Sequence, residues 1–306
     1  MRLRDIIQIL DEYSKDVSLT VSGIPNDNSN RKVVGVRSLK VAIHSIEKTG
    51  VFDKEISELK EIEGLFKSTQ DSVALPVREC DKAVKWLGNF RRKINVVNTV
   101  LNSILPEQDK NSICLKLPKI NNLKELSNVA SKLDKIFDQM LVNPYIEGET
   151  KLQNFDTGSE WIEVVFNTGK ALGVVVSVIY ASILLKREHI KNQELLEVVK
   201  NRKITNDIYQ NLSEELLNKS RQMLDEEAIK IANQAGVKDS DKEYSRRIKY
   251  CINEISELID KGLKFFPSSK SPSEIETKLP DFSKNSVEEM LSDVKRLPEE
   301  TTNNLN

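Results

Sequence analysis

The stretch KALGVVVSVIYASILLKREH, from Lys170 to His189, decides how this chain is built. Its fifteen residues from Ala171 to Leu185 carry no charge, in a chain whose residues are 30% charged. A membrane-spanning helix needs about 20 apolar residues, whereas about 15 is typical of a helix buried in a protein core. Lys170 and Lys186 close the run at its two ends. We therefore predict a core helix. The alternative is a membrane-active effector that inserts residues 171–185 after a trigger.

The residues upstream of this helix have the pattern of a small α+β unit. Apolar residues alternate in NSICLKLP, residues 111–118, which predicts a strand ended by proline. Residues 122–141 place their apolar side chains on one helical face. Residues 149–166 read as two strands around a turn at 156–159, the pattern of a hairpin. With the core helix they predict a βαββα module over residues 106–190.

Residues 1–105 are predicted to form an N-terminal helical region. Leu3, Ile6 and Leu10 have helical spacing, and a short strand is expected around Leu19 and Val21. Pro76 stands at the start of a long helix, where its fixed φ is favourable.

Long helices are also predicted downstream of the core helix. No proline occurs from Thr168 to Ala235, and residues 191–266 lack the sustained heptads of a parallel coiled coil. We expect a long-helix bundle over 191–266, followed by a flexible linker and a C-terminal tail helix over 267–306. The fold class is therefore mainly α: a helical bundle with long helices and a small embedded α+β (βαββα) unit.

The composition excludes several classes of function. Lys plus Arg number 46 against 47 Asp plus Glu, which argues against a surface that grips nucleic acid throughout. The three cysteines and two histidines have no metal-ligand spacing, so we expect no metal and no cofactor. Unpaired cysteines fit a reducing cytoplasm. The chain contains no phosphate-binding or hydrolase motif, so we expect no catalytic residues and no enzyme activity.

One basic segment is a candidate for nucleic-acid contact. Lys85, Arg91, Arg92 and Lys93 lie among Trp86 and Phe90 in KAVKWLGNFRRKIN, and such residues can hold phosphates and stack bases. A packed helix face with a solvated basic back explains them too, and we favour that interpretation. The alternative is a nucleic-acid-binding accessory protein that uses residues 82–93.

The tail repeats a pattern found earlier in the chain. Lys-Leu-Pro precedes an amphipathic segment at Lys116 and again at Lys278, and Ser286 with Glu289 forms a capping box. We expect the tail helix to dock an apolar face on the body or on a partner. The residues expected in that contact are Val287, Met290, Leu291 and Val294.

Together these features favour a non-enzymatic protein-interaction, scaffold or regulatory component. A protein partner or self-association is expected, nucleic acid is not favoured, and membrane insertion is disfavoured. The usage of Lys, Asn and Ile suggests a bacterial or phage-related setting, and we include defence or counter-defence systems in that expectation.

Overall fold

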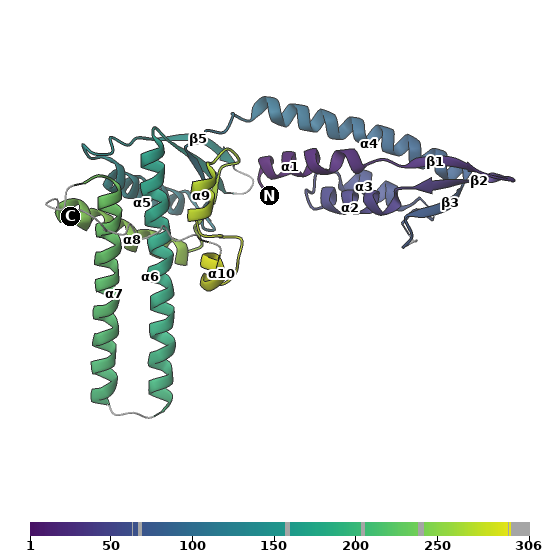
Figure 1. The fold of residues 1–306 in the computed structure, drawn as a ribbon. Coiled ribbons are helices and arrows are strands. Elements are labelled where there is room, and N and C mark those ends of the chain that lie inside the picture. The colour runs from purple at the N-terminus through teal and green to yellow at the C-terminus, as the bar shows by residue number, and fades with distance from the viewer. Residues whose placement is uncertain are drawn as a thin grey trace, which may run out of the picture. The chain divides into compact units, whose positions relative to one another are not determined.

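A computed structural model describes residues 1–62, 64–66, 69–156, 160–202, 206–237, 242–292 and 294 (Figure 1). It confirms the predicted fold class, because the chain is mainly helical with a small embedded α+β unit. The chain divides into two compact units, Met1–Pro106 and Glu107–Asn306. The second unit holds the predicted module, the long helices and the described part of the tail around one hydrophobic core.

The first unit combines helices with an antiparallel sheet of order β1-β2-β3. Its elements are α1 (Leu3–Tyr13), a 3-10 turn (Ser14–Asp16), β1 (Thr20–Ile24), β2 (Asp27–Val34), α2 (Val36–Glu47), α3 (Asp53–Lys60), β3 (Ser72–Pro76) and α4 (Val77–Ile104). The expectation of a helical region is therefore wrong for β2 and β3. The sequence DNSNRKVV of β2 is too polar to show strand alternation, and Val33 is its one fully covered side chain.

The core of the first unit lies between the sheet and its helices. The ring of Phe52 meets that of Phe90 edge-on at 5.2 Å between centroids, and both side chains are buried. The long helix α4 begins directly after Pro76, as the sequence predicts. Its buried residues are Cys80, Ala83, Leu87, Phe90 and Ile94.

The second unit is built on a four-stranded antiparallel sheet of order β5-β6-β4-β7. The strands are β4 (Ser112–Lys116), β5 (Thr150–Asp156), β6 (Trp161–Phe166) and β7 (Lys264–Pro267), and α5 (Leu123–Leu141) lies between β4 and β5 in the chain. The predicted order of strand, helix, hairpin and helix is confirmed, although residues 157–159 of the hairpin loop lie outside the described residues. The sequence did not reveal β7, because four residues are too few to show a period.

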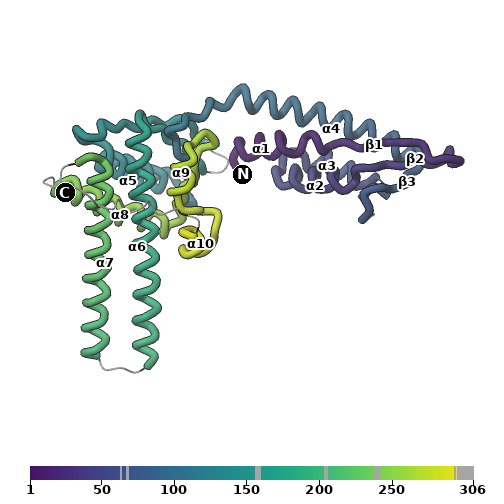
Figure 2. Tube along the Cα trace, in the orientation of Figure 1, coloured from purple at the N-terminus to yellow at the C-terminus, as the bar shows by residue number. Residues whose placement is uncertain are grey.

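The quoted apolar stretch lies at the centre of this unit. It forms the first half of α6 (Gly169–Asn201), and α7 (Asn206–Gln234) and α8 (Lys242–Asp260) pack against it (Figure 2). All of residues 171–185 are buried except Gly173, Ser177 and Tyr180, which are half-buried. The Ser182 hydroxyl lies 3.0 Å from the carbonyl oxygen of Ile252, so even a polar side chain here has a partner in α8. In the structure the run is covered by the protein itself.

Two buried polar side chains fasten α8 to α5. The hydroxyl of Tyr244 donates to the carbonyl of Met140 at 2.9 Å, and the thiol of Cys251 lies 3.5 Å from the carbonyl of Ile136. Burial raises the pKa of Tyr244 well above its usual range and raises the pKa of Cys251 to about 12. Both groups are therefore held neutral and serve as hydrogen-bonding parts of the core.

The described part of the C-terminal region is packed on this core, which differs from the flexible linker that we expected before the tail helix; residues 293 and 295–306 lie outside the described residues. Ser268 is buried and its hydroxyl donates to the carbonyl of Asp109 at 3.1 Å. The ring of Phe282 is 1% exposed and meets Phe265 at 5.7 Å. Two short helices, α9 (Ser273–Lys278) and α10 (Val287–Ser292), complete this region. The polar, proline-containing composition of this segment is typical of a flexible linker, although a few apolar side chains fix it on the core.

Candidate interaction surface

The candidate metal-binding and reactive side chains lie apart from one another among the described residues. Within the described residues there is no cluster of three or more His, Cys, Asp or Glu side chains able to hold a metal ion. His44 and His189 are both exposed, and Cys80, Cys114 and Cys251 are buried free thiols. Thiols buried in this way are structural rather than reactive.

A buried polar cluster on the sheet also has a structural explanation. Glu163 on β6 is 4% exposed and lies opposite Cys114 on β4. The Ser112 hydroxyl donates to Glu163 Oε1 at 3.0 Å. The Gln108 amide contacts Cys114 Sγ at 3.7 Å and accepts a hydrogen bond from the Ser269 backbone N–H at 2.9 Å. The cluster thus ties the start of this unit and the chain after β7 to the sheet.

The aromatic residues in the basic segment of α4 pack within the first unit. Trp86 and Phe90 lie 4.5 Å apart between ring centroids, and Phe90 is buried. Lys85, Arg91, Arg92 and Lys93 are exposed, as the packed-face interpretation expects. Lys93 forms an ion pair with Glu55 at 2.6 Å, which also lowers the pKa of the Glu55 carboxyl. The aromatic side chains that would stack a base are therefore occupied within the protein.

The tail residues expected to dock on the body or on a partner contact the chain's own core. Ser286 Oγ accepts a hydrogen bond from the backbone N–H of Glu289 at 3.2 Å, as the predicted cap requires. Val287 is buried in the core, and Met290 and Leu291 are half-buried against it. Val294 is also half-buried. This apolar face is satisfied within the molecule.

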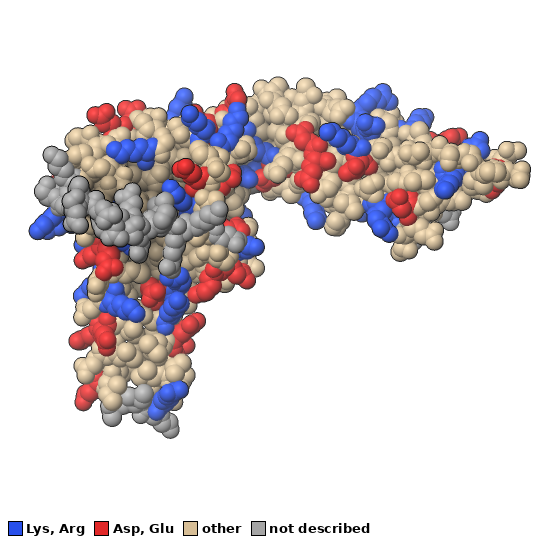
Figure 3. All heavy atoms as spheres, in the orientation of Figure 1, with Lys and Arg blue, Asp and Glu red and all other residues tan. Residues whose placement is uncertain are grey.

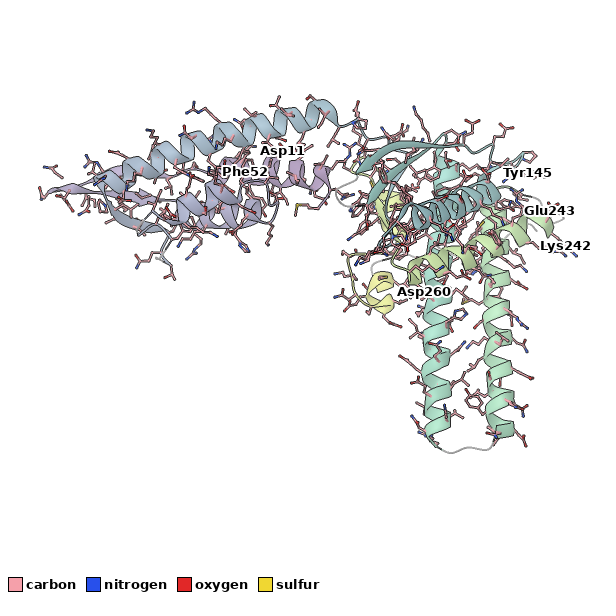
Figure 4. All side chains as sticks on the ribbon, turned by 180° about the vertical axis from the view of Figure 1, so that it is seen from behind. Asp11, Phe52, Tyr145, Lys242, Glu243 and Asp260 are labelled. Atoms are coloured by element: carbon pink, nitrogen blue, oxygen red, sulfur yellow. The ribbon has the colours of Figure 1, made fainter. Side chains whose placement is uncertain are left out.

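A helical arm offers a more open apolar surface. The second half of α6 and the first half of α7 run antiparallel beyond the sheet and α8, and we call residues 188–202 and 206–224 the arm (Figure 1). The arm's side chains project outward along the hairpin (Figure 4). Where it leaves the body, Lys186 pairs with Asp260 at the end of α8 at 2.5 Å. Four large apolar side chains are exposed on it: Leu195 at 43%, Val198 at 46%, Ile208 at 54% and Leu217 at 49%.

A polar contact inside the arm fixes how its two helices meet. Asn192 Nδ2 donates to Ser220 Oγ at 3.0 Å, and that hydroxyl donates to the carbonyl of Leu216 at 3.1 Å. Leu196 and Leu216 are half-buried one turn further out. A single polar pair in an apolar seam specifies register, because sliding the helices would leave its groups unpaired. The arm is therefore a defined hairpin, and its exposed apolar residues lie outside its own seam.

The surface of the arm mixes charges with apolar residues. Acidic and basic side chains are interspersed along it with uncharged surface between them (Figure 3). Sequence reasoning did not single out this surface, although its signal was present: Glu188, Lys191, Leu195, Val198 and Arg202 recur at alternating spacings of three and four. The expectation of a long-helix bundle over 191–266 did not say which residues would face solvent, and the structure leaves Leu195 and Val198 exposed.

α6 also has the length and composition of a membrane span. Among the helices of the described residues, Gly169–Asn201 alone is long and apolar enough to cross a bilayer, with 67% of its most apolar window buried inside the protein. The same length and composition occur in the core helix of a soluble protein.

Comparison with known proteins finds a bacterial relative. The chain is 30% identical over 297 residues to the Bacillus subtilis (strain 168) protein named "Uncharacterized protein YqaP", with 93% of this chain and 94% of that protein covered. No protein-family model matches the chain. No solved structure matches it either.

Proposed function

This chain belongs to the family of the Bacillus subtilis protein YqaP, and we propose that it works by binding another protein through its arm, as a scaffold or regulatory component rather than an enzyme. The observation that carries this proposal is the exposure of Leu195, Val198, Ile208 and Leu217 on a hairpin with a fixed register. Exposed apolar residues rimmed by charge are characteristic of sites that bind another protein.

The anatomy of the arm supports a binding role. Asn192 and Leu196 face the seam, whereas Leu195 and Val198 keep 43% and 46% of their surface exposed. The two residues are three apart and lie on one face of α6. An amphipathic helix face with such anchors is a recurring mode of recognition by helical partners. The bacterial relative supports the expectation of a bacterial setting.

Site-specific photo-crosslinking tests this proposal. A photoreactive amino acid at Leu195 should crosslink to protein in cells, whereas the same group at Val41, which is 53% exposed on α2, should not. A product of twice the chain mass identifies a second copy, and any other mass identifies a different protein. Equal crosslinking from both positions, or none from Leu195, would contradict an interaction surface on the arm.

A membrane-active role is the second candidate, supported by the length and composition of α6. Insertion would require residues 171–185 to leave the contacts they make with α8. Flotation with vesicles of mixed zwitterionic and anionic lipid measures this. Stable binding that protects α6 from protease would favour insertion, and recovery of the protein entirely in the lipid-free fraction would favour the arm.

A further inference from the structure

We propose that the partner of the arm is a second copy of this chain, bound antiparallel along one stripe of α6. The stripe consists of Glu188, Lys191, Leu195, Val198 and Arg202. This inference rests on the proposed function, since it names what the arm binds.

The spacing of the stripe is that of a helix–helix contact. Its residues alternate between steps of three and four, which keeps them on one face of a helix that packs against another. The seam of the arm uses a different set, including Asn192 and Leu196. α6 therefore carries two faces with heptad spacing, and α7 covers one of them.

The stripe is accessible in the structure. Leu195 and Val198 are 43% and 46% exposed, and Lys191 and Arg202 are exposed too. Glu188 is half-buried, and its ion pair with Arg187 is long at 3.9 Å. Within the part of the chain that the structure describes, Arg202 has no ion-pair partner. Arg202 is therefore available to a partner, and Glu188 has only a long ion pair to give up.

The charges of the stripe are complementary to themselves in one orientation. Glu188 lies seven residues before Leu195, and Arg202 lies seven residues after it. A twofold axis at Leu195 therefore places Glu188 of each copy opposite Arg202 of the other, with the two leucines in contact at the centre. A parallel arrangement would instead set like charges against each other, which is unfavourable. The stripe selects antiparallel pairing with its own copy.

The size of this contact sets the strength of the dimer. Fourteen residues separate the ends of the stripe, which at about 1.5 Å per residue gives a contact of about 21 Å. That is about four helical turns with two apolar anchors, smaller than the interfaces of obligate dimers. We expect reversible association of the full-length protein, with a dissociation constant on the order of 10 μM.

Light scattering on the full chain with charge reversals tests the proposal. The natural protein should pass from 34.8 kDa to twice that mass as its concentration rises through the micromolar range. Glu188→Arg and Arg202→Glu should each weaken the dimer about tenfold or more, because each creates two like-charge pairs. The double variant should restore it by exchanging the partners. Glu197→Arg, an exposed residue of the same helix outside the stripe, is the matched control and should leave dimerisation unchanged.

Each remaining outcome overturns the proposal. These are a natural protein that stays monomeric at several hundred micromolar, single reversals that dimerise normally, and a double variant that is not restored. The crosslinking experiment separates this failure from that of the proposed function. A monomeric protein whose Leu195 crosslinks to a different protein keeps the function and loses the self-association, whereas no crosslink at all removes both.

Discussion

Residues 171–185 and residues 188–202 belong to one continuous helix, but the protein surrounds them differently. Val176 in the first half is 1% exposed, whereas Val198 in the second half is 46% exposed. The same side chain on the same helix is core in one place and surface in the other, because α8 and the sheet cover only the first half. The surroundings of a helix, and not its composition alone, therefore decide which of its apolar residues are covered.

The sharpest way to break this comparison is to place a charge in each half. Val176→Asp buries an unpaired carboxylate and should destabilise the second unit by about 5 kcal/mol, enough to unfold it. Val198→Asp, the matched control, should change stability by less than about 0.5 kcal/mol. Thermal unfolding followed by circular dichroism measures both. A Val176→Asp protein that stays folded and merely loses vesicle binding would contradict the core role of residues 171–185.

A second substitution tests whether the tail is packed on the core of the second unit, as residues 171–185 are. Phe282 is buried against Phe265, so Phe282→Ala should cost about 3–4 kcal/mol through lost burial and the cavity left behind. Lys284→Ala nearby is exposed and should be neutral. Urea unfolding gives both values. If Phe282→Ala left the free energy of unfolding unchanged, the tail would not be anchored on the core and the account would be wrong.

The covered half should also respond to alkaline pH. The pKa values of Tyr244 and Cys251 are raised in the folded state, the thiol from 9.0 to about 12, so the folded protein holds protons that the unfolded chain releases. Stability should be complete below pH 9 and fall as the pH rises toward 12, by up to about 1.4 kcal/mol per pH unit for one group. Fluorescence of Trp161 in a Trp86→Phe background reports this unit alone. Cys251→Ala should flatten the dependence, and an unchanged slope would contradict the assignment.

The smallest effect expected concerns the register of the arm. Asn192→Ala and Ser220→Ala should each cost about 1 kcal/mol, and a double-mutant cycle should give a coupling of about 0.5–1 kcal/mol. The hydrogen bond from Gln222 to Glu226 at 3.0 Å, within a single exposed helix, provides a control pair with a coupling of about 0.3 kcal/mol. Equal coupling in the two pairs would mean that the Asn192 contact does not set register.

Sequence reasoning predicted the parts of the fold that show long periods. Helices α4 and α5 and the first half of α6 each extend over several turns, so their apolar patterns identify them. It missed β2, whose exposed polar residues show no alternation, and β7, which is four residues long. The anchoring of the tail was missed because it depends on a few buried side chains, such as Phe282, in a segment whose overall composition is polar. The arm surface was missed because exposure depends on which neighbours a helix lacks.

Hydrogen exchange along α6, followed by mass spectrometry at low and high protein concentration, tests the contrast between its two halves most directly. Amides of residues 171–185 should exchange slowly at both concentrations, because they open only when the second unit unfolds. Amides of residues 191–202 should exchange much faster in dilute protein and slow down as the concentration rises. Uniform protection along the helix at both concentrations, or slow exchange in residues 171–185 only after vesicles are added, would contradict the account.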